Sequence, residues 1–241
     1  MEAEKVSPSI ENSNCIARVL CRVSSGKEAD VYCCQACDHL GVELVAAKVF
    51  RPLETRGFRN DAVYRQGRVI RDERLRRACR NKSRTGRSVQ FNMWVSSEYE
   101  TLQLLHAEGA RVPAPCESVG DTIVMEYIGS RDRPAPTLNR VRLSDRDAAR
   151  VCREILEQVS LWLSCGRVHA DLSPYNILYL DGMITVIDFP QAVDPRRNPA
   201  AFSLLLRDVE RIAGYFGRLN ARFDAPDTAR RIWSDAGYPG I

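Results

Sequence analysis

One stretch of the chain, residues 168–191, holds the polar side chains best suited to catalysis. His169, Asp171 and Asn176 follow the spacing H-x-D-x-x-x-x-N, and Asp188 comes further along the same stretch. Mg2+ prefers carboxylate and carbonyl oxygens together with substrate phosphates. A carboxylate that is not used on the metal can accept a proton from an attacking hydroxyl. These residue types at this spacing therefore indicate divalent-metal and phosphate chemistry.

A predicted β-hairpin connects these side chains. Residues 177–180 are apolar and typical of a strand, and Asp181-Gly182 is a strong signal for a two-residue hairpin turn. Residues 183–187 form the returning strand. The loop before the hairpin and the loop after it must then lie at the same end. We therefore expect the two carboxylates and the carboxamide to share one small volume.

The spacing resembles the catalytic loop and the metal loop of protein kinases. Ala170 stands where the arginine of H-R-D would be, and residues 188–190 read D-F-P in place of D-F-G. HADLSPYNIL followed by IDFPQAVDP is more similar to the RIO family of atypical serine/threonine protein kinases. SSGKEADVY and RDVERI resemble that family's phosphate loop and closing helix. The resemblance covers roughly residues 16–220.

The resemblance implies an α+β, reduced two-lobe protein-kinase-like fold with ATP and Mg2+ (or Mn2+) in the cleft. Its N-lobe has a β-sheet plus a helix, and its C-lobe is mainly helical. We expect a loose lead-in over 1–15, an N-lobe over 16–130 with a basic insertion at about 51–90, and a C-lobe over 131–241. The implied protein is a short form of the bacterial type, without a winged-helix domain. It would transfer the ATP γ-phosphate to a protein hydroxyl or to itself.

A lysine in an apolar strand adds to the kinase resemblance. Residues 43–50, ELVAAKVF, predict a strand that holds Lys48, and a buried ammonium group is costly unless it has a partner. The kinase pattern supplies phosphate oxygens and a glutamate from a helix. Residues 94–107 predict that helix. Alignment with the RIO pattern makes Glu98 the partner, with Glu100 as the second candidate.

The resemblance also assigns roles to individual residues. The implied catalytic residues are Asp171 and Lys48. The implied metal ligands are Asn176 and Asp188. The residues implied to contact ATP come from the phosphate loop, the lysine pair and the hinge strand. They are Ser25, Gly26, Lys27, Lys48, Glu98, Met125, Glu126 and Ile128. We expect His169 to brace the loop, and Asp208 to orient it or to pair with an arginine.

Composition limits the class of protein. Hydrophobic residues are 44% and charged residues 27% of the 241, as is ordinary for globular proteins. The sequence holds neither an apolar run of membrane-spanning length nor a signal peptide, so we expect no membrane partner. Nine scattered cysteines without an export signal favour reduced thiols in the cytoplasm.

Positive charge is concentrated in residues 51–87, where 13 Lys and Arg face four acids. One interpretation is a partner such as RNA, a ribosomal particle or an acidic protein. The other is a solvated basic loop that screens nucleotide phosphates. Both stay open. A short helix is expected at 72–81.

Three helices are expected in the C-lobe, over 144–165, 201–219 and 227–235. Ser144 is a good N-cap for the first, and Gly166 ends it. Two other functions compete with protein phosphorylation: an ATPase switch acting on a ribonucleoprotein, and an aminoglycoside-type small-molecule kinase. About fifty residues follow Asp188, which is short for the helical substrate lobe of the latter.

Overall fold

The computed structural model describes residues 7–51 and 84–239, with the side chains of α4 described from residue 91 onwards. The described chain divides into two compact units. One holds residues 7–51, 84–103 and 113–134, and the other holds 104–112 and 135–239. The short helix expected at 72–81, and most of the basic insertion, lie outside the described residues.

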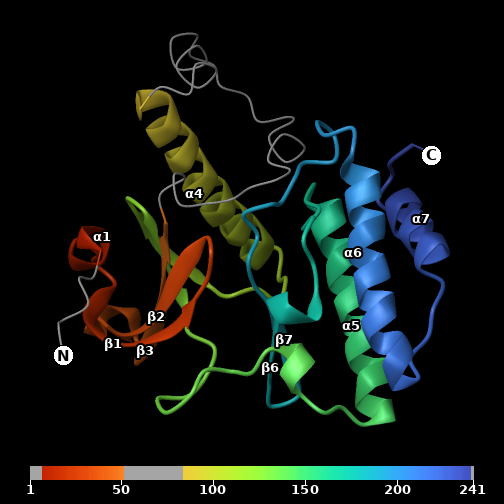
Figure 1. Cartoon of the computed structure of the whole chain (residues 1–241), viewed down its shortest axis with the longest axis horizontal. Coiled ribbons are helices and arrows are strands. Elements are labelled where there is room, and N and C mark those ends of the chain that lie inside the picture. The colour runs from red at the N-terminus through yellow and green to blue at the C-terminus, as the bar shows by residue number, and fades with distance from the viewer. Residues whose placement is uncertain (1–6, 52–83, 240–241) are drawn as a thin grey trace. The chain divides into compact units, whose positions relative to one another are not determined.

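A five-stranded antiparallel sheet is the framework of the first unit (Figure 1). Its spatial order is β1-β2-β3-β5-β4. The strands are β1 (Ile16–Ser25), β2 (Ala29–Ala36), β3 (Leu44–Phe50), β4 (Pro115–Val119) and β5 (Thr122–Glu126). Strand β3 begins one residue after the start of the strand predicted at 43–50 and ends at the same residue. The strand with the lysine, β3, is therefore central, with neighbours on both sides.

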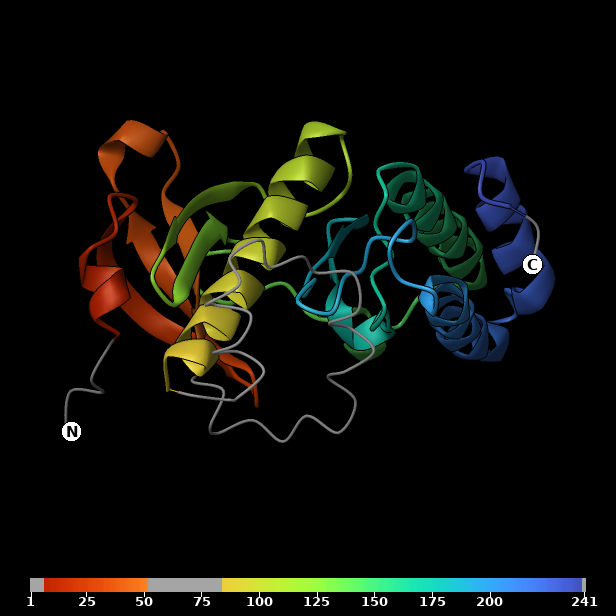
Figure 2. The same cartoon turned by 90° about the horizontal axis from the view of Figure 1, so that it is seen from above.

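Helix α4 (Arg84–Ala107) runs alongside this sheet (Figures 1 and 2). It begins ten residues before the predicted start at Trp94, so that boundary was wrong. The prediction followed the apolar side chains, whereas Arg and Gln favour a helix without adding apolar periodicity. Trp94 and Val95 are buried, and the Trp94 ring meets Phe50 of β3 edge-on, with centroids 4.8 Å apart.

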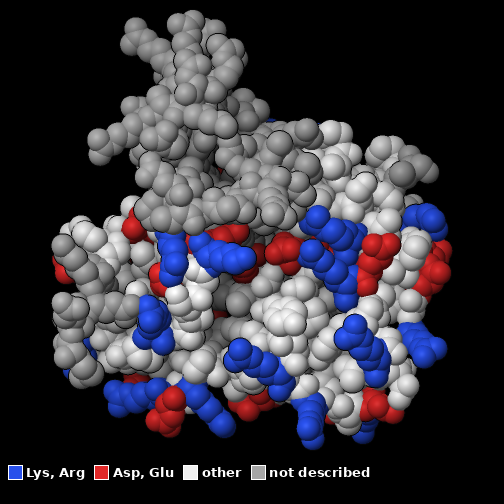
Figure 3. Space-filling view, in the orientation of Figure 1, with Lys and Arg blue, Asp and Glu red and all other residues white. Residues whose placement is uncertain are grey.

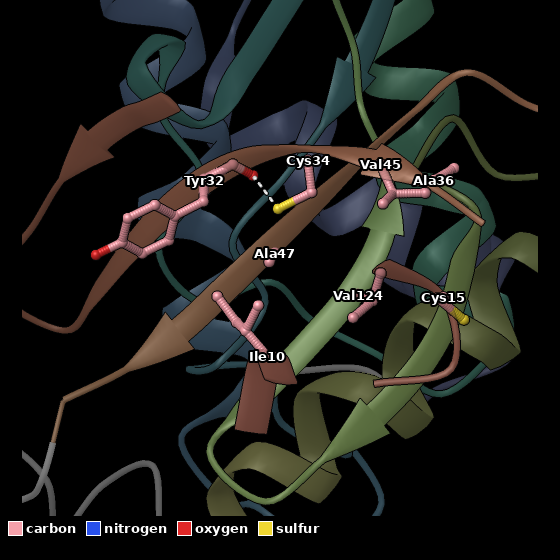
Figure 4. Close-up of a cluster of buried hydrophobic side chains, with 8 residues drawn as sticks. All are labelled: Ile10, Cys15, Tyr32, Cys34, Ala36, Val45, Ala47 and Val124. Carbon is pink, nitrogen blue, oxygen red and sulfur yellow. Dashed lines mark hydrogen bonds between the residues drawn. The ribbon is translucent and has the colours of Figure 1, made fainter. Parts of the chain in front are cut away.

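The other face of the sheet is covered by the N-terminal segment. Helix α1 (Pro8–Glu11) places Ile10 against the sheet, and Cys15 follows in the same layer (Figure 4). The sheet residues in this cluster are Tyr32, Cys34, Ala36, Val45, Ala47 and Val124. The expectation of a loose lead-in over 1–15 is therefore wrong for residues 7–15. The buried side chains of Ile10 and Cys15 pack this segment against the sheet.

Hydrogen bonds attach the same segment to the β4–β5 hairpin. The Ser7 hydroxyl donates to the Asp121 carboxylate at 2.9 Å, and the Ser13 hydroxyl donates to Glu117 at 2.6 Å. In each bond the two partners are more than a hundred positions apart in the chain, so no local sequence signal predicts the contact.

Three helices lie side by side in the second unit: α5 (Asp145–Ser164), α6 (Ala201–Phe216) and α7 (Ala225–Asp235) (Figures 1 and 2). The Ser144 hydroxyl accepts from the amide of Asp147, which confirms the predicted N-cap. Helix α7 begins two residues earlier than expected because Asp224 caps it. In the space-filling view, acidic and basic side chains are interspersed over this unit (Figure 3).

The predicted hairpin is present as β6 (Ile177–Leu180) and β7 (Met183–Val186). Asp181 has φ 49° and Gly182 has φ 84°. Positive φ at both central residues is the requirement of a type I′ turn, which Asp-Gly satisfies at low cost. Among the described helices none is long and apolar enough to cross a membrane.

Candidate active site

The base of the β6–β7 hairpin brings two predicted metal ligands to the same end. Beyond the last paired residues of the ladder, the amide of Ile187 donates to the carbonyl of Asn176 at 2.9 Å. Asp188 follows directly, with φ 72°. The expectation that the loops before and after the hairpin share one end is confirmed.

Asp208 of α6 holds the loop that carries Asp171. Its two carboxylate oxygens accept from the amides of Ala170 and Leu172 at 2.7 and 3.0 Å. Arg207, its neighbour on the helix, donates to the carbonyl of Ala170. Ala170 is buried with φ 67°, a left-handed conformation that costs about 1–2 kcal/mol for a residue with a Cβ. These bonds stabilise the strained backbone and confirm the structural role expected for Asp208.

Burial dominates the ionisation of this carboxyl. Desolvation raises the pKa of Asp208 to about 7, although the amides of Ala170 and Leu172 and two nearby arginines act in the opposite direction. A carboxyl in an unfolded chain titrates near pH 4. Between about pH 4 and 7 the folded chain therefore keeps a proton that the unfolded chain has lost. In that window the contribution of Asp208 to the free energy of unfolding falls as the pH rises.

We expect the stability of Asp208→Asn relative to wild type to increase from pH 5 to pH 7.5. Asparagine stays neutral and avoids the cost of a buried charge, while its loss of one amide acceptor is the same at every pH. Thermal unfolding across this range measures the difference. Asp235→Asn, an exposed change on α7, is the control. If the unfolding temperatures of Asp208→Asn and wild type change in parallel with pH, the raised pKa of Asp208 is contradicted.

His169 is buried inside the same loop. Its Nε2 lies 3.2 Å from the carbonyl of Ile187, and its Nδ1 accepts from the amide of Asp171 at 3.3 Å. This pattern requires the neutral tautomer with the proton on Nε2. Burial lowers the pKa of His169, which favours the same neutral form. The ring packs on Phe189, with centroids 4.5 Å apart. His169 therefore braces the loop, as expected.

Arg211 of α6 is a residue of this site that was not among the predicted site residues, although it lies in the RDVERI stretch. Its Nη1 lies 2.7 Å from Oδ1 of Asp171, and both side chains are partly exposed. The available signal was the spacing in RDVERI, because Arg207 and Arg211 are one helical turn apart and share a face. One face of α6 thus contacts the loop through Arg207, Asp208 and Arg211, while Ala170 replaces the usual loop arginine.

The donor set around Asn176 fits a magnesium ion shared with phosphates. The Asn176 Nδ2 donates to the carbonyl of Asp171 at 2.9 Å, which leaves Oδ1 as the oxygen for a cation. Asp188 supplies a carboxylate at the same end of the hairpin. Among the described residues no three His, Cys, Asp or Glu side chains gather as a metal cage. A cation with two protein oxygens and several outer ligands is the usual arrangement for Mg2+.

In the first unit, Lys48 of β3 and Glu98 of α4 form the expected pair. The Lys48 Nζ lies 2.6 Å from Oε1 of Glu98, and both side chains are buried. Glu100, the second candidate, is exposed. The pairing of Lys48 with Glu98 is confirmed. Taking two charged groups out of water costs much free energy, which their mutual attraction offsets. Removal of one partner from such a buried pair typically destabilises a protein by about 3–5 kcal/mol.

The sheet register shows which residues share the face of Lys48. Lys48 pairs with Ile123, and Ala46 pairs with Met125. Because side chains alternate along strands and opposite residues share a face, Met125 lies on the same face as Lys48. Met125 is buried, Glu126 is exposed, and Ile128 is intermediate.

The β1–β2 turn contains the predicted phosphate loop. The amide of Gly26 donates to the carbonyl of Ala29 at 2.9 Å, which closes the turn beside Lys27. The Ser25 hydroxyl accepts a hydrogen bond from the Arg51 side chain at 2.9 Å. Ser25, which is a predicted ATP contact, therefore already has a partner within the protein.

Arg51, expected as part of the basic insertion, belongs instead to the base of this turn. It forms two hydrogen bonds to Asp30, at 2.8 and 3.1 Å, and its guanidinium lowers the pKa of that carboxyl. Its amide also donates to the carbonyl of Glu28 at 2.8 Å. Arg51 thus connects the end of β3 to the β1–β2 turn.

Comparison with known proteins shows which family this chain belongs to. The model of the RIO domain matches residues 30–228, which is most of the chain. The chain belongs to the RIO family. Its α+β fold, with an antiparallel sheet in one unit and helices in the other, is that of an atypical protein kinase of the RIO type. The resemblance inferred from HADLSPYNIL and IDFPQAVDP is confirmed.

The relatives of this RIO protein include archaeal and eukaryotic kinases. It is 32% identical to the RIO-type serine/threonine-protein kinase Rio1 of Haloferax volcanii, over 90% of this chain and 70% of the relative. It is also 32% identical to Rio1 of Thermoplasma acidophilum, over 79% and 93%. Identity to the serine/threonine-protein kinase RIO1 of Caenorhabditis elegans is 30%, over 82% of this chain and 37% of that protein.

A solved structure shares the fold of this RIO domain. The Rio2 kinase of Chaetomium thermophilum, in an ADP/Mg2+-phosphoaspartate complex, superimposes with a TM-score of 0.64 at 22% identity. The superposition covers 89% of this chain and 61% of that chain.

Proposed function

We propose that this RIO protein is an ATP- and Mg2+-dependent serine/threonine protein kinase that phosphorylates a protein hydroxyl or itself. The observation that carries the proposal is the gathering of Asp171, Asn176 and Asp188 at one end of the β6–β7 hairpin. Asp208 and the Asn176–Ile187 hydrogen bond hold this arrangement in place. The names of the archaeal and eukaryotic relatives support the reaction class.

The residues on the Lys48 face are proposed to bind ATP. Lys48, held by Glu98, contacts the α- and β-phosphates, as the corresponding lysine does in kinases. The amides of Gly26 and Lys27 cover the phosphates. Met125 flanks the adenine. The list of proposed ATP contacts is completed by Ser25, Glu126 and Ile128.

The residues of the hairpin base are proposed to carry the phosphoryl transfer. Oδ1 of Asn176 and the carboxylate of Asp188 hold Mg2+, which, when bound, neutralises charge on the phosphate oxygens. Asp171 orients the acceptor hydroxyl and accepts its proton. Arg211 occupies Oδ1 of Asp171, so Oδ2 is the oxygen that we assign to the hydroxyl.

The identity of the acceptor separates a kinase from an ATPase switch. The phosphoaspartate complex of the Rio2 neighbour favours the switch as the second candidate, with Asp188 as the acceptor here. A single turnover with labelled ATP, followed by acid and then hydroxylamine, distinguishes the two. Acid-stable label on serine supports the kinase. Label released by hydroxylamine supports an acyl phosphate and the switch. Rapid labelling of an amino alcohol or sugar would contradict both.

A polyanionic partner such as RNA or a ribosomal particle is proposed for the basic segment, 51–87, from its charge alone. Replacing Arg74, Arg76 and Arg77 with serine should weaken binding to RNA or ribosomal particles and lower its salt dependence, because fewer counterions are released. Binding isotherms at several salt concentrations measure this, while basal ATP hydrolysis should change little. These three arginines lie outside the described residues.

The cytoplasmic location of the protein stays a prediction.

A charge-matched control for this experiment is available on the helical unit. Arg218, Arg222 and Arg230 are exposed, and their replacement with serine removes the same charge elsewhere. An equal loss of binding in the control would show that only net charge matters. Unchanged RNA binding with a weakened ATP affinity in the first variant would support phosphate screening instead.

A further inference from the structure

Two cysteines face each other on the sheet of the first unit. Cys21 of β1 and Cys33 of β2 are directly opposite in the antiparallel register. Directly opposite residues point to the same face, with Cβ atoms about 4.5–5.5 Å apart. Burial and, after it, the nearby Cys21 side chain raise the pKa of Cys33, as is expected for two thiols that lie close together. Cys21 is exposed, whereas Cys33 is only 1% exposed. An accessible thiol thus lies against a buried one.

The register places this pair on the face of Lys48. Cys33 is opposite Ala46 on β3, and Ala46 is opposite Met125 on β5. Lys48 is two residues from Ala46 on the same strand and therefore points to the same side. The Tyr127 hydroxyl, which follows β5, is near enough to Cys33 to lower the pKa of that thiol against the larger effect of burial. Cys21, Cys33, Ala46 and Met125 thus lie next to one another on four neighbouring strands. The surface that they form includes the one that we assign to adenine.

We propose that Cys21 and Cys33 form a reversible oxidation site, which a peroxide converts to a cross-strand disulfide next to the adenine surface. The sulfur of Cys21 attacks one peroxide oxygen, the O–O bond breaks, and water leaves, so that Cys21 becomes a sulfenic acid. The sulfur of Cys33 then attacks the Cys21 sulfur, the S–O bond breaks, and a second water leaves. Two electrons pass from the two thiols to the peroxide.

The unequal environments of the two thiols assign their roles. Cys21 is exposed and meets the oxidant first. Burial raises the pKa of Cys33, which keeps it as a thiol until the sulfenic acid forms beside it. The exposed residue is thus the one oxidised, and the buried residue resolves it.

Strand geometry makes such a disulfide easy to reduce. A relaxed disulfide needs Cβ atoms about 3.5–4.5 Å apart, which is closer than opposite residues normally stand. The strands must therefore approach each other locally, and strained disulfides are the more readily reduced. The same movement changes the surface beside Ala46 and shifts the Cys33 sulfur relative to the Tyr127 hydroxyl. We expect weaker ATP binding in the oxidised protein, and this consequence rests on the proposed function.

The test uses the full chain treated with hydrogen peroxide, followed by peptide mapping without reduction. We expect one disulfide that joins Cys21 to Cys33 and disappears with dithiothreitol. Cys33→Ser should instead accumulate a sulfenic acid on Cys21 that dimedone traps. Cys165→Ser, a partly exposed thiol of the other unit, should behave as wild type. Cysteines that stay reduced, or that pair with other cysteines, would overturn the proposal. Thermal unfolding of each variant verifies that it is folded.

A second measurement separates this site from the proposed function. ATP affinity should fall at least several-fold on oxidation of the wild type and stay constant in Cys21→Ser. A disulfide that forms without any change in ATP affinity would support the oxidation site and contradict the adenine placement. Reduced protein that binds no ATP would contradict the proposed function, while the peptide map would still decide the oxidation site.

Discussion

Asp188→Ala is expected to abolish Mg2+-dependent turnover of ATP. The carboxylate of Asp188 is one of two protein oxygens assigned to the cation, and a metal at a phosphoryl group contributes several kcal/mol of transition-state stabilisation. The loss should therefore be about a thousandfold or more, since each 1.36 kcal/mol is a factor of ten. Initial rates measured over a range of Mg2+ concentrations determine the effect.

Two further variants make this result specific. Asp188→Asn removes the charge and keeps a residue that tolerates φ 72°, so a loss of activity in a folded protein follows from chemistry rather than from backbone strain. Asp181→Asn removes a carboxylate at the opposite end of the same hairpin and suits its type I′ turn. It should retain activity. Near-normal turnover in Asp188→Ala would defeat the metal assignment.

Asp171→Asn should preserve ATP binding and reduce turnover by about a hundredfold or more, on the magnitudes of general-base catalysis. The amide oxygen of asparagine can still accept from Arg211, and the loop backbone remains tied to Asp208 through Ala170 and Leu172. The loop shape is therefore kept while the base is removed. Positioning supplies much of the remaining rate.

Equilibrium ATP binding and single-turnover kinetics together measure this effect. A hundredfold loss with unchanged ATP affinity supports the assigned role. If the variant turns over at the wild-type rate, the base lies elsewhere. A joint loss of binding and turnover, with a lowered unfolding temperature, would show that Asp171 supports the fold of the loop.

Several features could be predicted from short stretches of sequence because the physical cause is local. Asp181-Gly182 specifies the hairpin through its positive φ angles, and Ser144 caps α5 with its own hydroxyl. The hairpin then decides that Asn176 and Asp188 share one end, since both flank the same pair of strands. The family motif predicted the partner of Lys48, because a buried ammonium group needs a carboxylate.

Other features depend on contacts between distant parts of the chain. Arg211 reaches Asp171 across 40 positions because α6 packs beside the loop, and Arg51 reaches Ser25 across 26 because β3 pairs with β2. The early start of α4 was missed because its first turns have a polar sequence. Residues 7–15 were misread as loose because their apolar partners belong to strands far along the chain.

The sequence by itself therefore determined the reaction class, the order of elements and the polar residues that can perform the chemistry. Only the tertiary structure decided which groups hold those residues and which thiols meet. The opposition of Cys21 and Cys33 depends on register shifts on both sides of Cys21 in the β1–β2 ladder. Because side chains alternate along a strand, a shift of one residue would put Cys21 on the other face. Spacing within one strand carries no information about that pairing.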